Sequence, residues 1–291
     1  METIHAALHT ATTALTHYLT NSISGRQEAL WLLMYVLRIS QTELLTSKQR
    51  TLTPGEYSRY TDLIHQRISL NTPLAYLIGT VPFCGLTLSI QPPILIPRHE
   101  TEELVNELIE TLKLHQGPLK ILDMCTGSGC IALALASHLP SATITGCDND
   151  PQAIALATRN KNNLGLSNVT FRESDMFTNL AGQTFDLIIS NPPYLTPAEW
   201  HQLDADVKNW ETPHALVGGE SGLEYYEVII SQADRYLSGL LRQSTLPELA
   251  LEYGHTQSAA LSTILAQHGF QPPILKRDSF NHYRALWAYR V

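Results

Sequence analysis

The chain has 291 residues, and its 44% hydrophobic content is enough for one large core and a smaller second one. With 19 Lys and Arg against 27 Asp and Glu, the formal net charge is −8, so the basic footprint that duplex DNA requires is lacking. The longest strongly apolar run, residues 29–37, is shorter than the ~20 residues that cross a bilayer, and the N-terminus shows no basic stretch followed by an apolar one. We therefore expect a cytoplasmic protein that binds neither DNA nor membrane.

The four cysteines show no C-x-x-C spacing, and the 12 histidines form no H-E-x-x-H motif. We expect Cys84, Cys125, Cys130 and Cys147 to be reduced thiols, and we expect no metal site.

Residues 1 to about 70 predict a small bundle of short amphipathic helices. Ser24 begins a start signal before the apolar run at 29–37, and Thr53-Pro54-Gly55-Glu56 places proline at the first helical position of a capping box. Residues 83–90 then alternate with period two and predict a strand or hairpin. We expect a helical domain at 1–72 and a linker with a β-hairpin at 73–96.

The remainder, 97–291, alternates between strand and helix patterns and predicts an α/β domain with a doubly wound, Rossmann-like sheet. The last two strands have no room for a crossover helix between them, which is compatible with an antiparallel hairpin. Residues 195–222 are expected to form a long loop that acts as a substrate lid. The seven strands are predicted near 119–123, 142–147, 168–172, 185–190, 247–252, 273–276 and 284–290.

A glycine turn follows the first of these strands. Gly127 and Gly129 allow a ligand to approach the backbone closely at the start of the next helix. Asp148 follows the second strand, where the hydroxyls of a ribose would lie. Because Gly127, Gly129 and Ala132 also satisfy G-x-G-x-x-G/A, these residues leave a nicotinamide dinucleotide possible. We expect Asp123 to order the turn from beneath.

The tetrapeptide Asn191-Pro192-Pro193-Tyr194 follows the apolar strand at 185–190. The Asn191 side-chain oxygen and the Pro192 carbonyl can each accept a hydrogen bond from a planar NH2 group, and Tyr194 offers an aromatic wall. The two prolines restrict the loop before a substrate arrives. This pattern indicates chemistry on an amide or amine nitrogen.

The glycine turn, Asp148, Asp175-Met176-Phe177 and residues 191–194 together resemble the class I S-adenosylmethionine-dependent methyltransferases, and residues 191–194 resemble their amino-methylating branch. Within that branch the chain is similar to the bacterial release factor glutamine N5-methyltransferases. The first seventy or so residues match only in length and helical character. The similarity is carried by residues 72–79, 95–105, 218–223 and 251–257.

The resemblance implies transfer of a methyl group from S-adenosyl-L-methionine to the side-chain N5 of the glutamine in the Gly-Gly-Gln motif of class I peptide chain release factors, with S-adenosyl-L-homocysteine as product. It also implies that release factors are the protein partners and that the N-terminal domain recognises substrate. We expect a monomer.

The resemblance further implies roles for individual residues. Asn191, Pro192 and Tyr194 are expected to be catalytic, and these three with Pro193 and Arg98 are expected to bind substrate. His99, Met176 and residues 210–213 depart from the family pattern. Met176 stands where relatives often have an aromatic residue. The residues expected to bind the cofactor are Cys125, Thr126, Gly127, Ser128, Gly129, Asp148, Asp175, Met176 and Asn191.

Three other functions remain open at this point. A nucleic-acid adenine N6-methyltransferase shares the tetrapeptide in kind, a nicotinamide-dependent oxidoreductase shares the glycine turn, and a non-catalytic adaptor would share the cofactor site. Glu252 and Gln257 are expected to serve packing or hydrogen bonding at the edge of the sheet.

Overall fold

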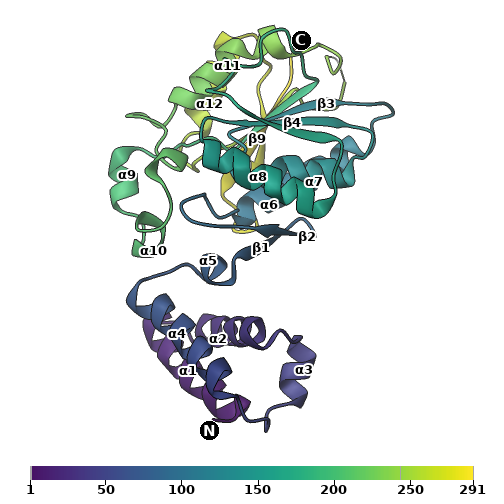
Figure 1. The fold of residues 1–291 in the computed structure, drawn as a ribbon. Coiled ribbons are helices and arrows are strands. Elements are labelled where there is room, and N and C mark those ends of the chain that lie inside the picture. Colours follow the sequence, from purple (N-terminus) through teal and green to yellow (C-terminus); the bar gives the residue numbers. More distant parts are fainter. Residues whose placement is uncertain (1, 243, 291) are drawn as a thin grey trace. The chain divides into compact units, whose positions relative to one another are not determined.

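The computed structural model describes residues 2–242 and 244–290, and Figure 1 shows its ribbon. The chain divides into two compact units. The first runs to Thr80 and includes the later segment Asp204–Trp210, and the second contains Val81–Leu203 and the chain from Glu211 onward. Within the described ranges, no helix is both long and apolar enough to span a membrane.

The first unit is a helical bundle. Its buried centre includes Ile4, Leu15, Leu33 and Tyr60, and the Tyr60 hydroxyl donates to the Ala29 carbonyl at 3.0 Å. Three of the helices have 16 residues each, so they are longer than the short helices that the sequence predicts. The helices are α1 Ile4–Leu19, α2 Ser22–Leu37, α3 Gln41–Thr46, α4 Pro54–Ser69, α5 Leu74–Ile78 and α10 Ala205–Lys208.

The start of α4 is as predicted. Thr53 and Glu56 form a reciprocal capping box, and Pro54 occupies the first helical position. The predicted start of the second helix at Ser24 is wrong, because α2 begins two residues earlier. There the Asn21 side-chain oxygen accepts from the backbone N–H groups of Ile23 and Ser24, which makes Asn21 the cap.

The expectation of one long loop at 195–222 is also wrong. This interval contains α9 Pro197–His201, α10 and the 3-10 turn η1 Pro213–Ala215. Part of it, Asp204–Trp210, packs in the helical unit, where the Trp210 indole N–H donates to the Leu70 carbonyl at 3.0 Å and Arg67 lies 3.8 Å from Asp206. The same unit contains α5, which the sequence-based boundary at residue 72 assigns to the linker.

The predicted strand or hairpin at 83–90 is a hairpin of β1 Thr80–Phe83 and β2 Leu86–Ser89. Its two-residue turn consists of Cys84 and Gly85, which have φ angles of 46° and 77°. Two positive φ angles in succession match the twist of the flanking strands, and glycine tolerates this conformation without strain.

A seven-stranded sheet forms the centre of the second unit, and the predicted bounds of its strands hold to about two residues. The order is β5-β4-β3-β6-β7-β9-β8, in which β9 is antiparallel to both β7 and β8. This confirms the doubly wound sheet and its C-terminal hairpin. The strands are β3 Lys120–Met124, β4 Thr143–Asp148, β5 Val169–Glu173, β6 Leu187–Ser190, β7 Leu249–Glu252, β8 Ile274–Arg277 and β9 Tyr283–Ala288.

Helices cover both faces of this sheet. Figure 1 shows α6 His99–Leu112, α7 Cys130–His138 and α8 Pro151–Leu164 on one face, with α11 Glu224–Tyr236 and α12 Ser258–Gln267 on the other. Successive strand residues point to opposite faces, so Ile121 joins the core with α6 and α7 while Leu122 joins the core with α11 and α12. The strand order reverses between β3 and β6, and the crevice beside such a reversal is the usual ligand site of an α/β sheet.

One buried amide ties the hairpin to the glycine turn. Asn160, on α8, accepts from the Ser89 N–H at 2.8 Å and donates to the carbonyls of Ser89 at 3.0 Å and Ser128 at 3.1 Å. The Asn160 side chain is only 1% exposed, and a buried amide requires such partners.

We expect Asn160→Ala to lower the free energy of unfolding by about 2–4 kcal/mol, because it removes the partner of the Ser89 N–H and of the Ser89 and Ser128 carbonyls. Urea unfolding followed by circular dichroism measures the change. Asn163→Ala, an exposed position on the same helix, is the matched control and should unfold like the wild type. Equal stabilities for the two variants would contradict this account of Asn160.

Candidate active site

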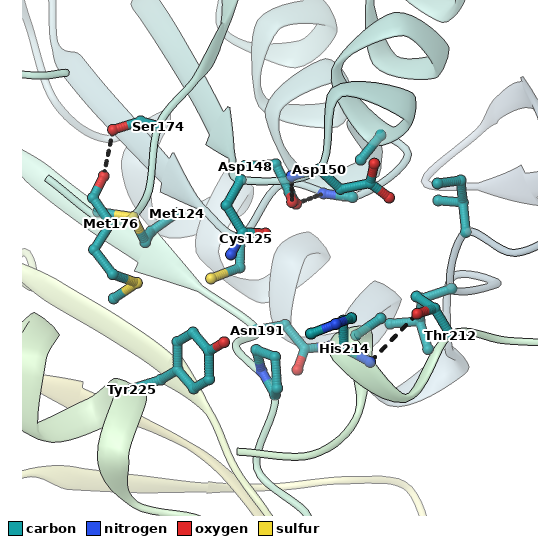
Figure 2. Close-up of a pocket in the computed structure, with 17 residues that line it drawn as sticks. Met124, Cys125, Asp148, Asp150, Ser174, Met176, Asn191, Thr212, His214 and Tyr225 are labelled. Carbon is teal, nitrogen blue, oxygen red and sulfur yellow. Dashed lines mark hydrogen bonds between the residues drawn. The ribbon is translucent and has the colours of Figure 1, made fainter. Parts of the chain in front are cut away.

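A cavity lies where β3, β4 and β6 end, and Figure 2 shows the residues that line it. They come from the strand ends, from the segment before α6, and from η1 and α11. The lining residues are Ile94, Leu95, Met124, Cys125, Gly127, Asp148, Asn149, Asp150, Ala153, Ser174, Met176, Asn191, Pro193, Thr212, His214, Ala215 and Tyr225.

Asp123 orders the glycine turn from beneath, as predicted. One carboxylate oxygen accepts from the Thr126 hydroxyl at 2.5 Å and from the Ala132 backbone N–H at 3.0 Å. The side chain is fully buried, and this burial raises the pKa of Asp123 to about 7. The acid therefore supports the turn without lining the cavity.

The two glycines of the turn differ in role. A Cβ on Gly129 would lie 2.9 Å from atoms of Ala157 and Phe171, so this position requires glycine for close helix packing. A Cβ on Gly127 would meet no protein atom within 4 Å, and Gly127 itself lines the cavity. Gly127 thus leaves space for a ligand, and Gly129 allows the turn to pack closely against α8 and β5.

Asp148 joins the end of β4 to the glycine turn. Its two carboxylate oxygens accept from the backbone N–H groups of Gly127 at 2.8 Å and Asp150 at 3.0 Å (Figure 2). Burial raises the pKa of Asp148, and these two hydrogen bonds oppose that shift. The carboxylate is therefore held in a fixed position at the cavity wall.

Met176 and Tyr225 lie near each other at one side of the cavity in Figure 2. The loop carrying Met176 is fixed by the Ser174 hydroxyl, which donates to the Met176 carbonyl at 2.7 Å. Asp175, which lies between Ser174 and Met176 in sequence, is exposed and does not line the cavity. The acid predicted to bind cofactor at this position therefore lies outside the cavity, and the methionine beside it lies within.

The loop at 191–194 is held from several directions. Gln257 donates its side-chain N–H groups to the carbonyls of Tyr194 and Gly222, both at 3.0 Å. Gly218 and Gly222 approach so closely that an added Cβ would lie 2.3 Å from the Pro193 and Tyr194 carbonyl oxygens, respectively. The glycines of the 218–223 segment are thus required for contact with this loop.

Asn191 reaches the cavity at the end of β6, and its side-chain N–H donates to the Thr101 hydroxyl at 3.1 Å. Tyr194 is partly buried, and burial raises its pKa to about 12, so its hydroxyl remains protonated at neutral pH.

Arg98 pairs with the buried carboxylate of Glu211 at 2.6 Å. This pair fixes the Arg98 guanidinium before α6.

The expectation for Gln257 is confirmed in its hydrogen bonding, but the placement of Glu252 at a sheet edge is wrong. Glu252 ends β7, which pairs with β6 on one side and β9 on the other, so it lies within the sheet. Its side chain is 3% exposed, and burial raises the pKa of Glu252 to about 7.

The structure brings part of the predicted site together. Cys125, Gly127, Asp148, Met176, Asn191 and Pro193 line the cavity. The predicted residues that do not line it are Thr126, Ser128, Gly129, Asp175, Pro192, Tyr194 and Arg98.

Sequence reasoning missed Asp150, His214 and Tyr225, which also line the cavity. Asp150 precedes the proline that begins α8 and could have been identified as its cap. His214 and Tyr225 carry no local signal, because they reach the cavity only through the course of residues 211–225. Among the described residues, no group of three or more His, Cys, Asp and Glu is arranged to hold a metal ion.

Comparison with known proteins identifies the family. Residues 99–206 match the Methyltransferase small domain, and residues 7–79 match the PrmC N-terminal domain. The release factor glutamine methyltransferase of Vibrio cholerae is 37% identical over 293 residues, covering 99% of this chain and 98% of that protein. That of Geobacter sulfurreducens is 40% identical over 215 residues, covering 74% of each.

This chain belongs to the release factor glutamine methyltransferase family. The membership confirms the family resemblance drawn from the sequence. It also favours that resemblance over the adenine methyltransferase and oxidoreductase alternatives.

Solved structures support the fold of this family member. The hMettl16 catalytic domain is 16% identical, covers 82% of each chain and gives a TM-score of 0.54. A methyltransferase from Pyrococcus furiosus is 17% identical, covers 71% of this chain and 90% of its own, and gives a TM-score of 0.50. At these identities, the likeness concerns the fold alone.

The raised pKa of Asp123 has a consequence for stability. The folded pKa of about 7 exceeds the ordinary value of 3.8, so the unfolded state releases this proton first and stability falls as pH rises from about 4 to 7. Asn at position 123 keeps one acceptor oxygen for Thr126 and Ala132 but cannot ionise. We expect Asp123→Asn to lose less stability than wild type between pH 4 and 8 in thermal unfolding scans. Identical pH slopes would exclude ionisation of Asp123 as the cause.

Proposed function

We propose that this chain transfers a methyl group from S-adenosyl-L-methionine to the side-chain N5 of the glutamine in the Gly-Gly-Gln motif of class I release factors. The observation that carries the proposal is the position of Asn191, which faces the same cavity as Gly127 and Asp148. The names of the relatives from Vibrio cholerae and Geobacter sulfurreducens support the same substrate.

The residues of the cavity fit the proposed cofactor. Gly127 leaves open space at the glycine turn, Asp148 presents a fixed carboxylate suited to ribose hydroxyls, and Met176 and Tyr225 provide apolar surface for a flat base. S-adenosyl-L-methionine supplies an electrophilic methyl group on a positively charged sulfur. The carboxylates of Asp148 and Asp150 at the cavity favour such a cation.

Asn191 and Pro192 orient the acceptor in this proposal. A carboxamide nitrogen is a weak nucleophile because its lone pair is delocalised into the carbonyl. When the Asn191 side-chain oxygen and the Pro192 carbonyl accept its two N–H groups, the nitrogen gains electron density and is aligned with the methyl carbon. The clamp that Gln257, Gly218 and Gly222 place on this loop keeps both acceptors in position.

The proposed reaction needs no protein base. The bond from sulfur to the methyl carbon breaks as the bond from nitrogen forms, and the methylated amide is then a strong acid that releases its proton to water. Tyr194, with its pKa raised to about 12 by burial, and Cys125, with its pKa raised well above the ordinary value, stay protonated at neutral pH. The contribution of the protein is therefore positioning and electrostatics.

Charge supports a protein as the macromolecular substrate. The formal net charge of −8 suits a partner that presents a basic surface, since complementary fields speed encounter. A release factor, which works against ribosomal RNA, fits this description. We assign recognition of that partner to the N-terminal helical unit, which leaves the cavity of the sheet for chemistry.

We expect Asn191→Ala to lower methyl transfer by roughly 10³-fold or below detection, because one of the two acceptors that hold the nitrogen is lost. Its affinity for the cofactor should stay within about threefold of wild type, since Asn191 is only one of many lining residues. Labelled S-adenosyl-L-methionine with a purified class I release factor, followed by mass spectrometry of the peptide that contains Gly-Gly-Gln, measures the transfer.

Two controls accompany this measurement. Asn163→Ala changes an exposed asparagine on α8 and should transfer methyl groups at the wild-type rate. A release factor with Gly-Gly-Ala in place of Gly-Gly-Gln should receive no label. Label on adenines of duplex DNA, with none on the release factor, would overturn the proposed substrate, and full activity of Asn191→Ala would overturn the role of that residue.

A further inference from the structure

Two buried polar side chains next to Asn191 have no part in the proposed chemistry. Thr101, in the first turn of α6, is 2% exposed, and Glu252, at the end of β7, is 3% exposed. One carboxylate oxygen of Glu252 has no hydrogen-bond partner among the described residues. Burying an acid in this way is unfavourable, so its presence beside the Asn191 loop calls for a physical reason.

Thr101 contacts Asn191 and adjoins Glu252. The Asn191 side-chain N–H donates to the Thr101 hydroxyl oxygen at 3.1 Å, and Thr101 lowers the pKa of the Glu252 carboxyl group beside it. A hydroxyl has one hydrogen, and an ionised carboxylate can only accept. Because Thr101 accepts from Asn191, its one hydrogen is available to an ionised Glu252.

The hydrogen bond to Thr101 determines which end of the Asn191 amide faces the substrate. An asparagine side chain has one accepting end and one donating end, and here the donating end is turned toward Thr101. The carbonyl oxygen is then the end that can accept from an incoming N–H. A reversed amide would present N–H donors to the N–H donors of a glutamine, and no hydrogen bond would form.

We propose that Thr101 and Glu252 are positioning residues for methyl transfer, and that ionised Glu252, acting through Thr101, holds the Asn191 amide with its oxygen toward the substrate. The inference rests on the proposed function and extends it to two residues behind the cavity. Neither residue touches the reacting atoms, since both act through Asn191.

The surroundings of Glu252 bring the pKa of its carboxyl group near neutral pH. Burial and the neighbouring Glu100 raise the pKa of Glu252 to about 7, while Arg284 and Arg98 oppose the shift. The other titratable groups that face it are Tyr194, Tyr226 and Cys130. The pKa of each of these three groups is raised by burial, so they stay neutral in this range.

Protonation of Glu252 would allow the opposite arrangement. A protonated carboxyl group can donate to Thr101, whose own hydrogen can then bond to the Asn191 oxygen and turn the amide. The turnover number should therefore fall as the pH drops through about 7, because the folded protein is then increasingly in the reversed arrangement.

Three variants test the proposal with labelled S-adenosyl-L-methionine and a class I release factor as substrates. Thr101→Val keeps the shape but removes the hydroxyl, and we expect kcat to fall about 10- to 100-fold with unchanged cofactor affinity. Thr101→Ser restores the hydroxyl and should recover kcat to within about threefold of wild type. Glu252→Gln cannot ionise, so the decrease in kcat below pH 7 should disappear.

Thr111→Val is the matched control, since Thr111 lies on the same helix and its hydroxyl donates to the Glu107 carbonyl of that helix. It should keep wild-type kcat. Circular dichroism and cofactor affinity check that each variant is folded, and the pH profile of the wild type provides a measurement that needs no variant.

The outcomes separate the two proposals. If wild type methylates the release factor but Thr101→Val matches it in kcat, or if Glu252→Gln keeps the wild-type pH profile, the positioning role is overturned and the proposed function stands. If wild type methylates no release factor, the proposed function fails and this inference fails with it.

Discussion

The parallel pairing of β3 with β4 on one side and β6 on the other is the constraint on which the cavity depends. Because the three strands run in the same direction, the turn after β3, Asp148 at the end of β4 and Asn191 after β6 all emerge at the carboxyl ends of the strands. The two helical layers bury the strands on both faces and so fix this alignment. Residues that are 64 positions apart, Gly127 and Asn191 (191 − 127), can therefore act on one ligand.

Much of the fold follows from local pattern. The strands of the sheet are short apolar runs between turn signals, and β8 and β9 are joined by too few residues for anything other than a hairpin. The capping box at Thr53 is likewise a local signal, since all its hydrogen bonds lie within four residues. The helices α9 and α10 were missed because four or five residues give no periodicity to detect.

The site was less predictable than the fold for a physical reason. Gly127, Asp148 and Asn191 each stand at a strand end, where sequence alone places them. The contact between Asn191 and Thr101 joins residues 90 positions apart, and Glu252 adds a third element. Such contacts depend on how α6 and β7 pack against β6, which no local pattern encodes. Asp175 shows the converse, because an acid after a strand can turn outward when the next residue fills the cavity.

The helical unit is not a continuous stretch of sequence. The chain passes between the two units after residues 80, 203 and 210. The short segment Asp204–Trp210 belongs to the helical unit, where the Trp210 indole N–H donates to the carbonyl of Leu70. Deleting the first 80 residues would therefore strip this indole of its partner. A chimera joined at residue 80 would likewise leave one piece of the helical unit behind, so an exchange of this unit has to include both segments.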